Sequence, residues 1–349
     1  MTRAVLLSEF DHRVWRAGFA AGQRPAPLPY GVDELARWGV DFTPCRELRY
    51  RLPRKVRDVA EHRAGMPVEA TLRAAPGVPS SDFVLALLET QGFFAASLKA
   101  RRIPPYSRKP LVVMSCWVAE RASSGDLSQR KKLVEHLRSA DLVTHLSRHE
   151  TPVLTDLGLD PNRLLAMTYG GSDDYYTPTD QVRDIDILAV GQDGGRDYAT
   201  LFRAVEGTEL RVALVCKSEN LKGLTVPEQI DLLGTVTLPD YRALLRRAKV
   251  VVVPTKDFLY PTGTSVSLEA SACGCAVVVT GTRAMRDYFT DGDNGLLVDV
   301  GDVDGWRAAL RRALGDDELR AALGSRARAK VESTFNTRVM WGEVATALT

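Results

Sequence analysis

A turn of small and hydroxyl residues, followed at once by a helical segment with a single carboxylate, is the part of the sequence best suited to chemistry. The turn spans 261–265 (Pro-Thr-Gly-Thr-Ser), the carboxylate is Glu269, and a buried strand is expected at 276–280. Backbone N–H groups at a helix start attract anions, and a carboxylate can accept hydrogen bonds from two hydroxyls. The segment is therefore suited to the phosphates and ribose diol of a nucleotide diphosphate. An ordinary capped helix on a strand is the alternative.

Short apolar runs alternate with helical patterns along the whole chain. Because these runs are apolar throughout, they predict strands buried on both faces of parallel sheets that helices cover. The predicted strands lie at 4–8, 83–88, 111–115, 142–146 and 164–168, then at 185–190, 212–216, 250–254, 276–280 and 296–298. The predicted helices include 91–101, 129–139, 198–205, 239–247 and 306–314, with an amphipathic tail at 336–349.

Length and composition fit a soluble enzyme of two domains. The chain has 349 residues, of which 45% are hydrophobic and 26% charged, and its net charge of +2 gives no reason to expect a nucleic-acid partner. Its five cysteines are few and mostly set in apolar runs, which favours reduced, buried thiols and a cytoplasmic location. No run has the length of a membrane span, and the N-terminal residues do not resemble a signal peptide.

The second half resembles the C-terminal domain of the GT-B glycosyltransferases of the retaining family 4. Four segments follow one another in the family's order, and they are 189–198, 248–254, 263–274 and 288–299. In the first half, 140–147 and 169–176 resemble the family's path into the hinge more weakly.

The resemblance implies an α/β GT-B fold, with two Rossmann-like domains whose parallel sheets face each other across a cleft. We expect an acceptor-binding domain at 1–178 and a nucleotide-sugar-binding domain at 183–333. We expect a C-terminal helix at 334–349 that packs back on the first domain.

Matched position by position, the resemblance also implies a donor site. Glu269 would hold the ribose hydroxyls, and Arg196 would contact the diphosphate in place of the family's loop lysine and so serve catalysis. An arginine can meet a phosphate with two parallel donors. The remaining candidates would add backbone, hydroxyl and ammonium donors, and they are Gly263, Thr264, Ser265 and Lys256. A surface arginine and a plain loop lysine are the alternatives for the two cations.

Two positions of the second half depart from the family pattern. Pro261 stands where the family has a second glutamate, which normally touches the donor sugar, and Gln192 stands where it often has an arginine. Recognition of the sugar is therefore an open question.

The first half departs further, because the family has a Gly-rich loop after the first strand and a histidine after a middle strand. Here 8–13 follows the first strand without a Gly pair, and Cys116 stands near the expected histidine. His12 is a candidate catalytic residue that approaches the donor sugar, with a solvated loop histidine as the alternative. Ser115 and Trp117, at a predicted strand end, are candidates for the acceptor pocket.

No segment predicts a metal site. Asp184 and Asp186 have the spacing of a metal motif, but they open a strand, where neighbouring acids usually face solvent. Cys273 and Cys275 lack a second Cys or His pair with ligand spacing.

The resemblance implies a glycosyltransferase that moves a sugar from a nucleotide-diphosphate sugar to an acceptor hydroxyl. Retention of configuration, and catalysis without a metal or other cofactor, are implied with it. The Ala- and Arg-rich composition suggests a bacterial source, and the cysteines favour a cytoplasmic location. The acceptor is a carbohydrate, a lipid or a small natural product. A basic segment, Arg46–Arg57, fits either weak contact with an anionic membrane surface at the inner face or a solvated face. A nucleotide-sugar epimerase of the same fold, and a non-catalytic sugar-nucleotide-binding partner of another transferase, are the alternative functions.

Overall fold

The computed structural model describes residues 1–43, 61, 66–125 and 134–348, so the basic segment Arg46–Arg57 lies outside the described residues. Internal contacts group the chain into two compact units. Unit 1 comprises Met1–Ala20, Ala26–Thr168 and Trp341–Thr349, and unit 2 comprises Ala21–Pro25 and Tyr169–Met340.

Unit 1 is built on a six-stranded sheet with the order β2-β1-β3-β4-β5-β6, in which every neighbouring pair is parallel. Its strands are β1 Thr2–Leu7, β2 Val40–Thr43, β3 Phe83–Ala86, β4 Leu111–Met114, β5 Leu142–His145 and β6 Leu164–Ala166. Strands β3 and β4 are buried at every position, as expected for a parallel sheet covered on both faces. The order of the strands reverses between β1 and β3, so the loops after these two strands flank the crevice where such sheets bind ligands.

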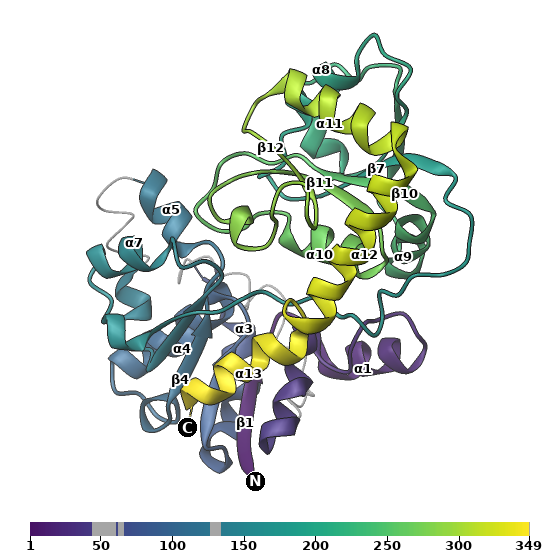
Figure 1. Ribbon diagram of the computed structural model, residues 1–349. Helices are drawn as coiled ribbons and strands as arrows, with labels where there is room; N and C mark the ends of the chain where they lie inside the picture. The colour runs from purple at the N-terminus through teal and green to yellow at the C-terminus, as the bar shows by residue number, and fades with distance from the viewer. Residues whose placement is uncertain (44–60, 62–65, 126–133, 349) are drawn as a thin grey trace. The chain divides into compact units, whose positions relative to one another are not determined.

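The helices and 3₁₀ segments of unit 1 lie between these strands, and Figure 1 labels most of the α-helices. They are α1 His12–Ala20, η1 Pro29–Trp38, α3 Glu69–Ala74, η2 Ala75–Ser80, α4 Glu89–Ala100, η3 Tyr106–Arg108, α5 Val118–Ser124, α7 Thr151–Asp156 and η4 Pro161–Arg163.

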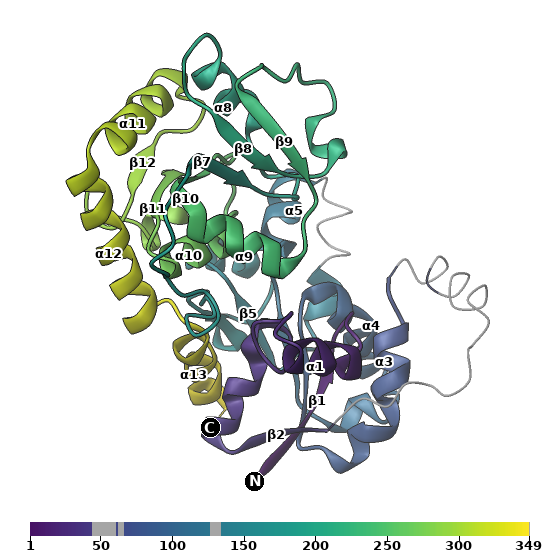
Figure 2. The ribbon, with the colours of Figure 1, turned by 90° about the vertical axis from the view of Figure 1, so that its right-hand side faces the viewer.

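The last helix, α13 (Thr337–Leu348), returns the chain to unit 1, as we predicted for the C-terminal helix. The indole Nε1 of Trp341 donates to the carbonyl of Tyr30 at 2.8 Å. A Cβ at Gly342 would lie 2.9 Å from the ring of Trp38, so only glycine allows this approach. Figure 2 shows α13 beside the purple segment that contains η1.

Unit 2 repeats the same architecture with the order β12-β11-β10-β7-β8-β9, again parallel throughout. Its strands are β7 Ile185–Val190, β8 Val212–Val215, β9 Ile230–Gly234, β10 Ala248–Val253, β11 Ala276–Thr280 and β12 Leu296–Val298. Its helices and 3₁₀ segments are α8 Tyr198–Val205, η5 Ser218–Leu221, α9 Leu238–Arg247, α10 Thr264–Ala272, η6 Met285–Asp287, α11 Val303–Gly315 and α12 Asp317–Ser333.

Two apolar clusters hold unit 2 together, one on each face of its sheet. Successive strand residues point to opposite faces, so Val250 and Val252 join the cluster with α8 and α11, whereas Val251 and Val253 join the cluster with α9 and α10. Figure 1 shows these helices on the two sides of the sheet. Burial of one such valine stabilises the fold by roughly 1.5–3 kcal/mol. Together, these buried residues hold β7 and β10 in place, and with them the points from which the following loops start.

The two central strands, β7 and β10, are neighbours although they are not consecutive in the chain. The order of the strands reverses between them, which is the position where an open parallel sheet binds a ligand at the carboxyl ends of its strands.

The segment at 169–176 lies in unit 2, whereas we expected the first domain to extend to 178. Gly171 explains the difference, because its N–H donates to the carbonyl of Phe335 at 2.9 Å and its own carbonyl accepts from Thr337 at 3.1 Å. These backbone hydrogen bonds tie the segment to the residues that precede and begin α13.

Candidate donor site in unit 2

The loops that follow β7 and β10 are joined backbone to backbone. The N–H of Asp197 donates to the carbonyl of Pro254 at 3.0 Å, and the N–H of Lys256 donates to the carbonyl of Gly195 at 2.9 Å. Between these bonds, Arg196 and Thr255 form an antiparallel bridge. The geometry therefore brings together two sequence segments that lie about 60 residues apart, at the carboxyl edge of the sheet.

Arg196 is a buried cation with an unused donor. Only 3% of its side chain is exposed, its Nε donates to the carbonyl of Val190 at 3.3 Å, and its Nη2 lies 3.4 Å from Oδ2 of Asp193. Its Nη1 is buried without a hydrogen-bond partner. A Cβ at Gly191 would lie 1.8 Å from Nε, so glycine at this position makes room for the guanidinium. Burial excludes the alternative that Arg196 is an exposed surface arginine.

The guanidinium of Arg196 lies at the start of helix α10. Gly263, the N-cap residue, has a φ of 84°, and a Cβ there would lie 2.6 Å from Nη1 of Arg196 and 2.4 Å from Cγ1 of Val253. As a glycine, the N-cap residue provides no side-chain cap, and the N–H of Thr264 donates to the carbonyl of Pro261 at 3.1 Å. A buried cation beside the positive end of a helix dipole is electrostatically unfavourable until an anion joins them. The arrangement is thus suited to a strongly charged anion.

The other residues predicted for the phosphates lie around this point. Lys256 is exposed, and its Nζ lies 3.1 Å from the carbonyl of Gly194. The hydroxyl of Thr264 is buried and donates to the carbonyl of Pro261, so Thr264 has no hydroxyl proton left for a phosphate. Ser265 is partly exposed in the first turn of α10.

Glu269 lies further along α10 and has two tyrosine partners that the sequence analysis missed. The hydroxyl of Tyr241 donates to Oε2 of Glu269 at 2.7 Å. Burial raises the pKa of Glu269 to about 7, although the hydroxyls of Tyr241 and Tyr176 act to lower it. Glu269 is six residues beyond Gly263, which corresponds to about 9 Å along a helix axis. The carboxyl group of Glu269 is therefore separate from the start of α10. It accepts hydrogen bonds from hydroxyl groups, and a ribose also presents hydroxyl groups.

In unit 1, His12 is the first residue of helix α1, which follows the short loop after β1. It is buried, its Nε2 has no partner, and burial, with smaller effects of Arg73 and Arg16, lowers its pKa to about 4. The imidazole is therefore neutral at neutral pH. The alternative of a solvated loop histidine is wrong, because the loop folds back and Arg73 donates to the carbonyl of Ser8 at 3.1 Å.

Ser115 and Trp117 follow β4 at the carboxyl edge of the sheet in unit 1. The hydroxyl of Ser115 is buried without a partner, whereas Trp117 is partly exposed. A buried residue that the sequence analysis missed, Glu89, holds this loop through the N–H groups of Cys116 at 2.9 Å and Trp117 at 3.1 Å. Its position at the start of α4, directly after β3, is a signal that could have identified it.

A second buried carboxyl group lies after β5. Glu150 accepts from the N–H of Leu146 at 3.1 Å, and burial raises its pKa to about 8. His145, at the end of β5, is fully buried, and its Nδ1 lies 3.0 Å from the carbonyl of Ser147. These contacts make His145 a packed core residue.

The two motifs that resemble metal ligands have other partners. Asp184 is held by two nitrogens of Arg247, at 2.8 and 2.7 Å, and Asp186 lies 2.6 Å from Nζ of Lys249. Cys273 and Cys275 are buried free thiols. Among the described residues, no group of three or more His, Cys, Asp or Glu side chains could hold a metal ion.

Within the same part of the chain, no helix is both long and apolar enough to cross a membrane.

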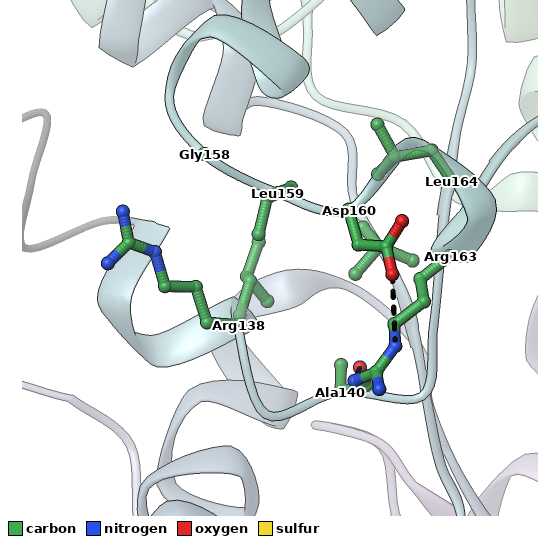
Figure 3. Close-up of a pocket in the computed structure, with 9 residues that line it drawn as sticks. Arg138, Ala140, Gly158, Leu159, Asp160, Arg163 and Leu164 are labelled. Atoms are coloured by element: carbon green, nitrogen blue, oxygen red, sulfur yellow. Dashed lines mark hydrogen bonds and ion pairs between the residues drawn. The ribbon is translucent and has the colours of Figure 1, made fainter.

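A cavity of about 190 Å³ lies in unit 1, away from the residues predicted for the site. Figure 3 shows the ion pair at its rim, in which Nε of Arg163 lies 3.7 Å from Oδ2 of Asp160. Ala140 and Leu164 place the cavity at the amino ends of β5 and β6, the edge of the sheet opposite to Ser115 and Trp117.

Comparison with solved structures defines the class of protein: the chain has the two-domain GT-B fold. Anabaena Alr3699/HepE in complex with UDP and glucose aligns with a TM-score of 0.69 at 14% identity, covering 100% of this chain and 99% of that chain. Sucrose-phosphate synthase from Thermosynechococcus elongatus aligns with a TM-score of 0.71 at 16% identity, with the same coverage.

The sequence comparisons relate part of the chain to a known family. Residues 214–330, about a third of the chain, match the model of the glycosyl transferases group 1 family. A capsular polysaccharide biosynthesis glycosyltransferase, CapM of Staphylococcus aureus, is 25% identical over 146 residues, which are 38% of each chain. A phosphatidyl-myo-inositol mannosyltransferase of Mycolicibacterium smegmatis is 48% identical over 66 residues, 19% of this chain and 17% of its own. The match therefore spans less than half of either relative.

Proposed function

We propose that the protein is a glycosyltransferase that transfers a sugar from a nucleotide-diphosphate sugar to the hydroxyl of an acceptor. The observation that carries this proposal is the buried guanidinium of Arg196, whose free Nη1 lies at the uncapped start of α10. A diphosphate supplies an acceptor for this unpaired Nη1 and for the start of the helix. The match of residues 214–330 to the model of a glycosyl transferase family supports the same activity.

The proposed chemistry is stabilisation of the leaving group. The bond between the anomeric carbon and the phosphate oxygen breaks, and its electron pair stays on the diphosphate. The acceptor oxygen forms the new bond to the anomeric carbon, and the acceptor proton passes to the departing phosphate oxygen. Arg196, the N–H groups of Ser265 and Val266, and the ammonium of Lys256 meet the charge that builds on the diphosphate.

Retention of configuration and independence from a metal are part of the proposal. Arg196 and the start of α10 offer the positive charge that a metal supplies in other transferases. His12 is proposed to meet the sugar with its neutral imidazole, and Ser115 and Trp117 to meet the acceptor.

The decisive experiment compares Arg196→Ala, Arg196→Lys and the wild type by calorimetry with uridine diphosphate. The uridine nucleotide is the first probe because Anabaena Alr3699/HepE, a protein of the same fold, was crystallised with UDP. Screens with guanosine, thymidine and adenosine diphosphates follow. We expect Arg196→Ala to weaken binding more than tenfold, which corresponds to about 1.4 kcal/mol. Arg196→Lys should restore part of the loss, because lysine keeps the positive charge but lacks the two parallel N–H donors of a guanidinium.

Arg203→Ala is the matched control, because it removes the same charge from an exposed position on the adjacent helix α8. Far-UV circular dichroism of each variant verifies folding. Affinities of Arg196→Ala within twofold of the wild type would contradict the donor site. Formation of a new glycoside, in step with release of the nucleoside diphosphate, then establishes transfer.

A further inference from the structure

Asp193 lies in the loop between β7 and α8, and its carboxylate lies beside the guanidinium of Arg196 in the candidate site. Its Oδ1 accepts from the N–H of Gly195 at 2.8 Å and from the hydroxyl of Thr262 at 3.5 Å. Its Oδ2 lies 3.4 Å from Nη2 of Arg196. A backbone N–H, a hydroxyl and a guanidinium form the set of donors that recognises a phosphate group.

The carboxylate also solves an electrostatic problem of the ligand-free protein. The side chain of Arg196 is 3% exposed, and its Nε donates to the neutral carbonyl of Val190 at 3.3 Å. A buried cation without a counter-ion is strongly destabilising. Asp193 supplies the negative charge while no phosphate is present.

The side chain of Asp193 can rotate away from Arg196, whereas hydrogen bonds hold the backbone around it. Its side chain is 44% exposed, so rotation into water costs little desolvation. The loop itself is held by Asn220, whose Nδ2 donates to the carbonyls of Gln192 and Asp193 at 3.2 Å each. The hydroxyl of Tyr198 adds a bond to the carbonyl of Gly191 at 2.7 Å. The side chain of Asp193 can therefore move while these hydrogen bonds keep the backbone of the loop in place.

We propose that Asp193 is an anionic placeholder, which neutralises Arg196 in the empty site and is displaced when a diphosphate binds. This inference rests on the proposed function, since it assigns the diphosphate to the same guanidinium. Two anions cannot share one guanidinium without repulsion, so the ligand and the carboxylate compete. The competition lowers the affinity for every diphosphate, including the nucleoside diphosphate product, and so favours its release.

The test is calorimetry of Asp193→Asn with inorganic pyrophosphate and with uridine diphosphate. Asparagine keeps an oxygen for the N–H of Gly195 but removes the charge. We expect pyrophosphate to bind Asp193→Asn at least fivefold more tightly than the wild type. We also expect the ligand-free variant to melt at a lower temperature and to gain more from saturating pyrophosphate, because Arg196 then has only the ligand as its counter-ion.

Asp257→Asn is the matched control, since Asp257 is exposed on the loop after β10 and carries the same charge. Its affinity should stay within twofold of the wild type. Equal tightening in both variants would overturn the placeholder in favour of a general charge effect. Unchanged or weaker binding to Asp193→Asn would overturn it in favour of a loop-positioning residue. If Arg196→Ala still lowers affinity in that case, the donor site stands and only the placeholder is wrong.

Discussion

At the scale of single residues, the carboxyl group of Glu269 is poised between two protonation states. Burial raises its pKa to about 7, and the hydroxyl of Tyr241 holds one of its oxygens at 2.7 Å. The two hydroxyls of a ribose need an ionised carboxylate as acceptor, because a protonated group gives up acceptor capacity. In the proposed function, binding of a nucleotide at this position is therefore expected to be coupled to loss of a proton.

This coupling predicts a pH dependence that belongs to Glu269. With a pKa of about 7 in the free protein, the ionised fraction rises from roughly one tenth at pH 6 to nine tenths at pH 8, so affinity should rise about tenfold and level off above. Uridine diphosphate glucose is the probe for calorimetry, because its phosphates do not titrate in this range. In Glu269→Gln the affinity should be weak and independent of pH. A pH dependence that survives in Glu269→Gln would contradict the ribose role.

The sequence alone identified Arg196 and Glu269 as candidates because each lies in a local motif. It could not identify Asp193, since the sequence does not show that this carboxylate folds back onto the arginine three residues further along. Tyr241 and Glu89 were missed for a related reason. Their partners lie 28 and 27–28 residues away in the chain, and only the packing of helices against strands brings them together.

At the scale of elements, apolar composition predicted the buried strands and missed two edge strands. Strand β10 is buried along nearly its whole length and was expected within two residues of its bounds. Strand β9 lies at the edge of its sheet, and four of its five residues are exposed, so it lacks the apolar run of a central strand. Strand β2 is also an edge strand and has four residues. Pairing with a neighbour, rather than burial, makes these segments strands.

The start of α10 depends on the absence of a side chain at Gly263, which gives a second prediction. Its φ of 84° disfavours other residues, and a Cβ would press on Val253 and Arg196. Gly263→Ala should reduce the free energy of unfolding by more than the about 1–2 kcal/mol of the left-handed conformation alone. It should also abolish pyrophosphate binding, because the clash displaces the guanidinium.

Gly207→Ala is the matched control for Gly263→Ala. Gly207 has a φ of 70°, yet nothing lies within 4 Å of the position of its Cβ. The substitution should carry the conformational penalty alone and leave pyrophosphate affinity unchanged. Denaturant unfolding and calorimetry on both variants separate the two effects. Equal losses in the two variants would show that close packing at Gly263 is unimportant.

At the scale of the whole molecule, the chain uses the same sheet twice. In both units the strand order reverses beside the first strand, and in both the predicted site residues follow strand ends at the carboxyl edge. The resemblance to a glycosyltransferase family predicted this duplication, and solved structures of the same fold confirm it. The limit between the units was harder to place, because backbone bonds of Gly171 to Phe335 and Thr337 connect segments that are far apart in the sequence.

The C-terminal helix α13 makes the stability of unit 1 depend on the end of the chain. Trp341 is 1% exposed, and its indole donates to the carbonyl of Tyr30. Trp341→Ala should therefore reduce the free energy of unfolding of unit 1 by about 3–5 kcal/mol, the usual cost of deleting a large buried aromatic side chain. Thr346→Ala, at an exposed position of the same helix, should change it by less than about 0.5 kcal/mol. Hydrogen exchange of the amides in β1 and β3 measures the effect in unit 1 directly, and protection equal to that of the wild type in Trp341→Ala would show that α13 is dispensable for this unit.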